Sequence, residues 1–248
     1  MISIKDIYKR FGNNDVLKGI NFNIQQGESL AIIGKSGSGK SVLLKHLNRL
    51  LEPDSGEVWI NNILINGLSS KKLQSIRAKM GMVFQSGALF DSMSVGENIG
   101  LALRRLTNIS EEEILSRILS SLKDVGLHGT EDLLPSELSG GMRKRVGIAR
   151  AIAIEPTVLL YDEPTTGLDP IMTDTINRLI TKFHVEKKIT SVIVTHELST
   201  VYKVANRVIL INDGRIRFDG TPDELRNSND MIVKQFITGD STMKIEEK

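Results

Sequence analysis

The sequence predicts an α/β fold with a mostly parallel core sheet, an N-terminal antiparallel β subdomain and an inserted helical subdomain. Two short apolar runs rich in β-branched residues, 157–161 and 190–195, are typical of strands buried on both faces of a parallel sheet. About the first 65 residues contain runs in which apolar and polar residues alternate, which is typical of antiparallel strands. Between about residues 88 and 154 the apolar residues recur at helical spacing.

The N-terminal part is expected to contain four strands and one helix. The helix is predicted over 39–51, because Pro53 and Gly56 prevent it from continuing. Gly and Asn residues mark the turns between the strands, which are predicted over 2–7, 16–24, 29–33 and 57–65.

The helical subdomain is placed at about 88–154, inside one domain that spans 1–240 and is followed by a polar tail over 241–248. Ser110 and Glu113 predict a capping box at the start of one of its helices. The apolar face of that helix is expected to consist of Ile114, Leu115, Ile118, Leu119, Leu122 and Val125. A further helix around 174–186 separates the two buried strands, and a short helix over 230–237 precedes the tail.

Composition excludes several classes of protein. The 32 Lys and Arg residues nearly balance the 30 Asp and Glu residues, giving a formal charge of +2, so no nucleic-acid partner is expected. The absence of cysteine rules out a disulfide framework and a thiolate metal site. No apolar run reaches the roughly 18 residues of a membrane-spanning helix, and residues 1–10 carry charges where a signal peptide has an apolar core. We therefore expect that the protein reaches a membrane only through another subunit.

A glycine-rich loop follows the strand predicted over 29–33 and matches the pattern G-x-x-x-x-G-K-[ST] in full. Its residues are Gly34, Lys35, Ser36, Gly37, Ser38, Gly39, Lys40 and Ser41. The glycines let backbone N–H groups converge on phosphate oxygens, Lys40 reaches the β- and γ-phosphates, and the Ser41 hydroxyl is a ligand for Mg²⁺. The alternative is a glycine turn with a solvated lysine. The pattern predicts a P-loop that binds ATP.

Two carboxylates, Asp162 and Glu163, end the apolar strand predicted over 157–161. An unpaired charge there is costly unless it serves a cation, although an ordinary solvated strand end is the alternative. Beside a P-loop, Asp162 is predicted to face Mg²⁺ and Glu163 to be the general base that deprotonates the attacking water.

A second candidate anion site lies at the start of a basic helix. It consists of Ser139, Gly140, Gly141 and Met142. Taken alone, these residues are more typical of a loop with a helix cap.

Six features of the sequence follow one another in the order and approximate spacing of the ABC ATPase family, which the chain resembles over almost its whole length. They are the P-loop, Gln85, the 138–141 motif, Asp162-Glu163, the 167–169 motif and His196. The resemblance implies the P-loop ATPase fold of that family and hydrolysis of ATP coupled to transport. It also implies that Phe11 stacks on adenine, that Gln85 lies between Mg²⁺ and a membrane partner, and that His196 contacts the γ-phosphate. Without it, Phe11 is equally a core aromatic and His196 a structural histidine.

The same resemblance explains the second anion site. In this family two chains pair head to tail, so that Ser139 to Met142 of one chain close over the ATP held by the P-loop of the other. Asp169 would lie at that interface. Position 142 departs from the commonest family pattern, which has glutamine there. The resemblance therefore gives little support to a role of the residue 142 side chain in binding ATP. Ser139 and the backbone N–H groups can still bind phosphate.

The sequences of segments 85–95 and 135–142, including Met142, resemble those of the ATPases in the bacterial Mla, the Mkl-type and the chloroplast lipid-trafficking systems. That resemblance implies a membrane permease, an MCE-type lipid-binding protein and phospholipid as cargo. It places the chain on the cytoplasmic face of the inner membrane, or on the stromal face of the chloroplast inner envelope. Amino-acid or metal import, the soluble ATPase of iron–sulfur cluster assembly, and a purely structural nucleotide-binding module remain alternatives.

Two further expectations concern side chains without an assigned role in ATP hydrolysis. His46, His128 and His184 are interpreted as surface or helix residues. The apolar residues after Gln85 are expected either to receive a coupling helix of the permease or to pack the helical subdomain. These residues are Ala88, Leu89, Phe90, Met93 and Val95.

Overall fold

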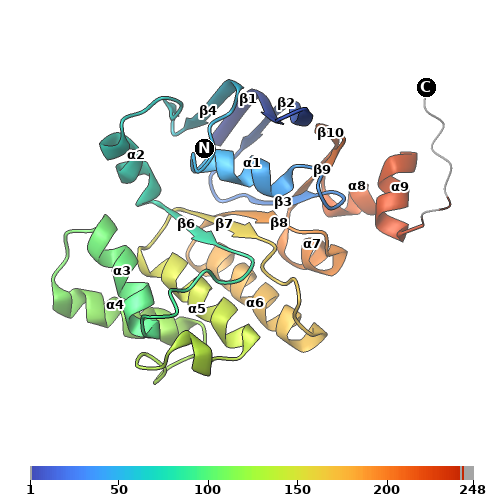
Figure 1. Cartoon of the computed structure of the whole chain (residues 1–248). Coiled ribbons are helices and arrows are strands. Elements are labelled where there is room, and N and C mark those ends of the chain that lie inside the picture. The colour runs from blue at the N-terminus through green and yellow to red at the C-terminus, as the bar shows by residue number, and fades with distance from the viewer. Residues whose placement is uncertain (1, 241, 243–248) are drawn as a thin grey trace. The chain divides into compact units, whose positions relative to one another are not determined.

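The computed structural model describes residues 2–240 and 242, and its elements are drawn in Figure 1. The chain forms two compact units, which are described separately. The first unit combines Met1–Gly67 with Val192–Lys248, and the second is Leu68–Ser191. Apart from residue 242, the tail predicted over 241–248 lies outside the described residues.

The first unit contains an antiparallel sheet with the strand order β2-β1-β4-β5. Its strands are β1 (Ile2–Phe11), β2 (Asn14–Ile24), β4 (Ser55–Ile60) and β5 (Ile63–Leu64). Buried and more exposed residues alternate over Ile2–Ile4 of β1 and Ile20–Ile24 of β2, as their sequence alternation predicts, and a register shift between Ile4 and Ile7 interrupts the pattern. The antiparallel N-terminal sheet expected from the sequence is therefore confirmed.

One strand prediction in this sheet was wrong. The segment predicted as a single strand over 57–65 is a tight hairpin of β4 and β5. Asn61 and Asn62 form its turn with φ angles of 47° and 64°. Asparagine tolerates this left-handed conformation better than most residues, so the Asn-Asn pair was the turn signal that the apolar pattern concealed.

The first unit also contains β3 (Ser29–Ile33), β9 (Arg207–Asn212) and β10 (Arg215–Gly220). β3 pairs in parallel with β9, and β9 pairs antiparallel with β10. These strands belong to a sheet with the order β10-β9-β3-β8-β7-β6, in which β8 (Thr190–Val194) starts in the second unit and ends in the first. Every residue of β3 is buried, which explains the apolar run that follows Ser29.

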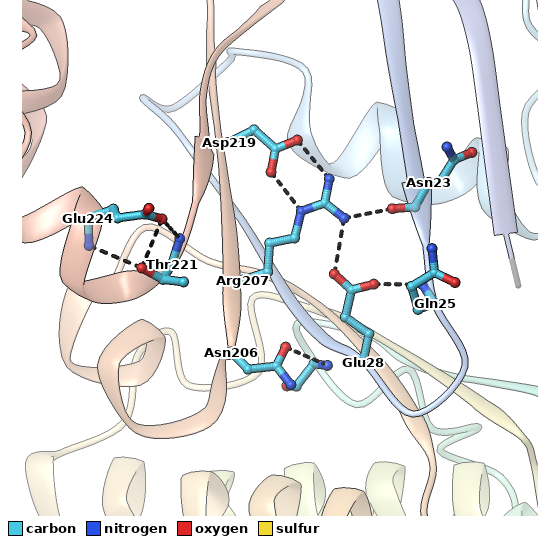
Figure 2. Close-up of polar contacts among 9 residues, drawn as sticks. Asn23, Gln25, Glu28, Asn206, Arg207, Asp219, Thr221 and Glu224 are labelled. Atoms are coloured by element: carbon cyan, nitrogen blue, oxygen red, sulfur yellow. Dashed lines mark hydrogen bonds and ion pairs between the residues drawn. The ribbon is translucent and has the colours of Figure 1, made fainter.

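Arg207 fixes the strands around β3, as Figure 2 shows. Its guanidinium binds both carboxylate oxygens of Asp219 on β10, at 2.6 and 2.7 Å, and this pairing raises the pKa of Arg207 above its ordinary value. The same side chain donates to the Asn23 carbonyl at 2.8 Å and to buried Glu28 at 3.1 Å. β9, β10 and the turn that leads into β3 are thereby held together by one side chain.

The helices of the first unit are α1 (Lys40–Leu47), α7 (Leu198–Val204), α8 (Pro222–Arg226) and α9 (Met231–Thr238). The last corresponds to the short helix predicted over 230–237. The helix predicted over 39–51 ends four residues early, at Leu47, because the chain turns at Arg49 with φ 54°. The apolar core of this unit consists of Ala31, Ile33, Val201, Val208, Leu210, Leu225 and Val233.

The second unit joins the strands β6 (Met80–Val83) and β7 (Val158–Asp162), which pair in parallel, to six helical segments. These are α2 (Ser70–Arg77), α3 (Val95–Leu106), α4 (Glu111–Asp124), the 3₁₀ turn η1 (Pro135–Glu137), α5 (Gly140–Ala153) and α6 (Pro170–Glu186). α3, α4 and α5 pack on one another and form the predicted helical subdomain. They appear in green and yellow in Figure 1.

Two details of α4 differ from expectation. Ser110 caps the helix by accepting from the Glu113 N–H, but the Glu113 carboxylate pairs with Arg117 instead of returning to Ser110. Leu115 and Leu119 are 55% and 43% exposed, so the buried face is narrower than predicted. The remaining members of the predicted face, Ile114, Ile118, Leu122 and Val125, are buried as expected.

Candidate functional site

The P-loop belongs to the first unit and connects β3 to α1. Gly34 has φ 152° and Gly39 has φ 99°, conformations that residues with a side chain rarely adopt. A Cβ atom on Gly34 would lie 2.4 Å from the Ile211 carbonyl oxygen, and one on Gly39 would lie 2.8 Å from Leu17. Both glycines are therefore required by the backbone path and by close packing against β2 and β9.

Lys40 lies against the carbonyl groups of its own loop. It is 7% exposed, and its Nζ donates to the Gly34 oxygen at 2.9 Å and to the Lys35 oxygen at 3.1 Å. A buried ammonium group at the start of α1, where the helix dipole is also positive, creates a strongly anion-attracting position.

The outer part of the loop is open. Lys35, Ser36 and Gly37 are exposed, and a Cβ atom on Gly37 would meet nothing within 4 Å. The Ser38 hydroxyl is buried and has no hydrogen-bond partner in the described residues. Ser41, in the first turn of α1, is partly buried. A buried hydroxyl without a partner and backbone N–H groups at a helix start are what a phosphate group requires.

Two other predicted residues lie in the first unit with the P-loop. His196 is exposed and follows β8, and its neighbour Thr195 donates its N–H to the Ile32 oxygen of β3 at 3.2 Å. His196 and the P-loop thus start from adjoining strand ends. Phe11 ends β1 opposite Asn14, is 47% exposed, and has the Lys9 Nζ 5.5 Å from its ring centre. An exposed ring on the hairpin that packs against Gly39 is free to stack on a flat ligand.

The second unit carries the two carboxylates. Asp162 is the last residue of β7 and is 8% exposed. Glu163 follows with φ 50°, a left-handed conformation that is strained for a glutamate. Its carboxylate accepts a hydrogen bond from the Thr166 hydroxyl at 2.9 Å. Backbone strain of this kind concentrates at functional sites, and here it sets the direction of one carboxylate.

Gln85 follows β6, the strand that pairs with β7, and its side chain is exposed. Val83 lies opposite Tyr161, so Gln85 and the two carboxylates leave neighbouring parallel strands at the same sheet edge. The loop after Gln85 is held by Arg150 of α5, which donates to the Gly87 oxygen at 2.8 Å and to the Ala88 oxygen at 2.7 Å. Gly87 also packs against Gly147, where a Cβ atom would be 3.2 Å away.

The second candidate anion site lies at the start of α5. Ser139 is the N-cap, and its hydroxyl accepts from the Met142 N–H at 3.2 Å. Gly140 is exposed, while a Cβ atom on Gly141 would lie 2.5 Å from Met172 of α6. Asp169 caps α6 by accepting from the N–H groups of residues 171 and 172 at 2.9 and 3.0 Å. The 139–142 turn and the loop ending at Asp169 are therefore packed together within this unit.

The apolar residues after Gln85 differ in exposure. Val95 is completely buried in the helical subdomain, whereas Phe90 is 54% exposed. Asn98 of α3 fixes the loop that presents Phe90, because its side chain accepts from the Phe90 N–H at 2.8 Å and donates to the Phe90, Met93 and Ser94 carbonyls. The Asn98 side chain therefore holds the backbone of the loop on which Phe90 is exposed.

The structure reveals three residues that sequence reasoning missed: Asn98, Lys144 and Arg150. Each is a polar side chain that holds a loop of the second unit. Nothing in their local sequence distinguishes them from solvated polar residues, since their partners are backbone carbonyls in other segments. Of the three histidines left without a role, His46 lies buried in α1, His184 lies in α6 and His128 is exposed in a loop.

The donor set expected for Mg²⁺ suits that ion. The expected ligands, Ser41, Gln85 and Asp162, offer one carboxylate and two neutral oxygens, and Mg²⁺ is usually bound by one or two carboxylates together with substrate phosphates. Across residues 2–240 and 242, no group of three or more His, Cys, Asp or Glu could hold a metal ion by itself. Within the same residues, none of the helices has the length and apolar character needed to cross a membrane.

Comparison with known proteins gives the family. Residues 17–166 match the model of the family described as ABC transporter, so the chain belongs to the ATP-binding proteins of that family. It is similar to TRIGALACTOSYLDIACYLGLYCEROL 3 of Arabidopsis thaliana, with 44% identity over 96% of this chain and 74% of that protein. The intermembrane phospholipid transport system ATP-binding protein MlaF of Haemophilus influenzae is 38% identical, over 97% of this chain and 91% of its own length.

The methionine import ATP-binding protein MetN 1 of Bacillus cereus is also similar, with 40% identity over 100% of this chain and 72% of that protein. Among solved structures, the ATP-binding cassette MJ0796, as a dimer bound to ADP and Pi, superposes with a TM-score of 0.83 at 36% identity. The match covers 90% of this chain and 99% of that one. These likenesses confirm the predicted fold class and show that the chain is an ATPase.

Proposed function

We propose that this ATPase energises the movement of phospholipid between membranes, as the nucleotide-hydrolysing subunit under a separate permease. The observation that carries the proposal is the similarity to TRIGALACTOSYLDIACYLGLYCEROL 3 over 96% of the chain and to the phospholipid transport ATP-binding protein MlaF over 97% of it. Met142 and the sequence of segment 85–95, which resemble those of the lipid-trafficking ATPases, also support the proposal.

In the proposed reaction the P-loop and Lys40 bind the phosphates, and Phe11 stacks on the adenine. Glu163 takes a proton from the attacking water, and His196 holds the γ-phosphate. When bound through Ser41, Gln85 and Asp162, Mg²⁺ would neutralise charge on the phosphates. The buried cation, the unpartnered Ser38 hydroxyl and the oriented Glu163 carboxylate support these roles.

We also propose that two chains act together. Ser139 to Met142 of one chain would bind the ATP held by the other, with Asp169 at the interface. The similar cassette MJ0796, which is a dimer when bound to ADP and Pi, supports this arrangement. The exposed Gly140 and the helix start at α5 supply N–H groups for a phosphate that their own chain does not use.

The partners follow from the same proposal: a permease that docks on the 88–93 loop, and an MCE-type protein that carries the lipid. The chain would lie on the cytoplasmic face of the inner membrane, or on the stromal side of a plastid envelope. Methionine import is the second candidate, supported by the match to MetN 1 over the full chain. Purification of the chain with its permease, followed by ATPase measurements with phospholipid vesicles and with methionine, separates the two. Stimulation by methionine alone would overturn the lipid proposal.

The residue roles have their own test. Glu163→Gln keeps the shape of the side chain and removes the base, so we expect the rate to fall about 10²–10⁴-fold while ATP binding and an ATP-bound dimer persist. Lys40→Ala should instead weaken ATP binding, because it removes the buried cation. Turnover and dimer formation, followed by light scattering with ATP, distinguish the variants. Equal, small effects of both substitutions would show that the roles are misassigned.

A further inference from the structure

Lys144 is a buried cation in an unfavourable position. It is 8% exposed and lies in α5, so its ammonium group has lost most of its hydration. Lys144 is therefore stable only with well-placed acceptors. One of them is the carbonyl oxygen of Thr166, which lies 2.5 Å from the Lys144 Nζ.

Thr166 links this lysine to the reacting carboxylate. Its hydroxyl donates to Glu163 Oε2 at 2.9 Å, and its N–H lies 3.4 Å from the Glu163 carbonyl oxygen. Glu163 itself has the strained φ of 50°, so its direction depends on contacts of this kind. A continuous path of hydrogen bonds thus runs from α5 through Lys144 and Thr166 to Glu163, entirely within the second unit.

We propose that Lys144 is a positioning residue for ATP hydrolysis: through Thr166 it fixes the Glu163 carboxylate relative to the start of α5. The inference rests on the proposed role of Glu163 as the base. Because α5 begins with the 139–142 turn, a shift of that turn when it binds the second chain's ATP would move Lys144 and reorient Glu163. The base of each chain would then respond to ATP in the site that its own 139–142 turn completes.

The test uses the full-length chain with four substitutions. Lys144→Met keeps the length of the side chain and removes the charge, Lys144→Arg restores a donor, and Thr166→Val removes only the hydroxyl. Lys123→Met is the matched control, an exposed lysine at the end of α4. Turnover, KM for ATP, the Hill coefficient for ATP and the melting temperature are measured for each.

We expect Lys144→Met and Thr166→Val each to lower kcat by about 10- to 100-fold, the cost of a misplaced catalytic group, with KM and melting temperature near the wild-type values. The Hill coefficient should fall towards 1, and Lys144→Arg should recover most of the rate. The double variant should be no slower than the slower single variant, because both residues act on one carboxylate. Lys123→Met should match the wild type.

Three results would overturn the inference: an unchanged kcat in Lys144→Met, rate losses that multiply in the double variant, or a loss of rate that follows loss of nucleotide binding and of melting temperature in both single variants. These results differ from failure of the proposed function, in which Glu163→Gln itself leaves the rate unchanged.

Discussion

Arg150 offers a sharp test of how the loop after Gln85 is held. Its guanidinium donates to two carbonyls of that loop, those of Gly87 and Ala88. The Arg150 side chain is partly buried, and burial lowers its pKa from the ordinary value. We predict that Arg150→Met, which keeps much of the side-chain volume, releases the loop.

The size of the effect follows from the two carbonyls. Gly87 is buried, so its oxygen loses its partner without gaining water, at a cost of about 1–3 kcal/mol. Ala88 is exposed, so its oxygen can bind water and contributes less. Since 1.4 kcal/mol is a factor of ten, the loop should open about 10- to 100-fold more often.

Amide hydrogen exchange of the segment 84–93 measures this opening directly. Arg150→Met should lose about 10- to 100-fold of protection there, while α4 keeps its protection. Permease-stimulated ATPase should fall more than the basal rate, since Gln85 lies at the start of the released loop. Arg178→Met, at an exposed arginine of α6 paired with Asp174, is the control and should change neither measurement. Unchanged exchange over 84–93, or equal loss throughout the second unit, would refute the reasoning.

Two other predictions concern different parts of the chain. Phe90→Glu should detach or uncouple the permease while leaving ATP affinity nearly unchanged, because Phe90 is exposed on a loop that Asn98 fixes. Pull-down of the permease and lipid-transfer assays measure this effect. Unchanged permease binding and unchanged lipid transfer would exclude this loop as the docking site. His46 concerns stability: burial, with a smaller contribution from Lys9, lowers its pKa, against the opposing effects of the Val42 carbonyl and Asp54. The unfolded chain therefore takes up this proton first as the pH falls below about 6.5, and stability should be lost between that pH and the lower pKa of the folded state. The melting temperature should drop less between pH 7.5 and pH 5.5 in His46→Gln than in the wild type. An equal drop in both proteins would contradict this role of His46.

The parts of the fold that the sequence predicted are those specified by local patterns. β3 was predicted with its observed bounds because a buried serine and four buried apolar residues end at a glycine with a required backbone conformation. The errors arose where tertiary contacts outweigh local pattern. Leu115 and Leu119 continue the apolar spacing of α4 yet are exposed, because α3 and α5 cover only the face that carries Ile114, Ile118 and Leu122.

The candidate site divides in the same way. The sequence could identify the P-loop because its shape is a property of its own glycines. The residues that hold the other loops could not be found, since Asn98, Lys144 and Arg150 bind carbonyls 4 to 63 positions away in the chain. Every residue has a backbone carbonyl, so the sequence does not show which carbonyl accepts a hydrogen bond. A partner of opposite charge, in contrast, can be predicted when it lies three or four residues away on the same helix.

The two units thus stabilise their loops by different physical means, and this has a consequence for movement. The P-loop is fixed by backbone conformations, by packing that admits no Cβ atom at Gly34 or Gly39, and by Lys40, which directly follows Gly39, so its shape is set mainly by the motif's own residues. In the second unit, α5 supplies Arg150 to the loop after Gln85 and Lys144 to the Glu163 turn. A displacement of α5 must therefore carry both loops with it or break charge-assisted hydrogen bonds of about 1.5–3 kcal/mol each. Because Ser139 caps α5, one helix connects the proposed trans contact, the proposed base and the loop proposed to face the permease, so ATP bound by a second chain would act on all three at once.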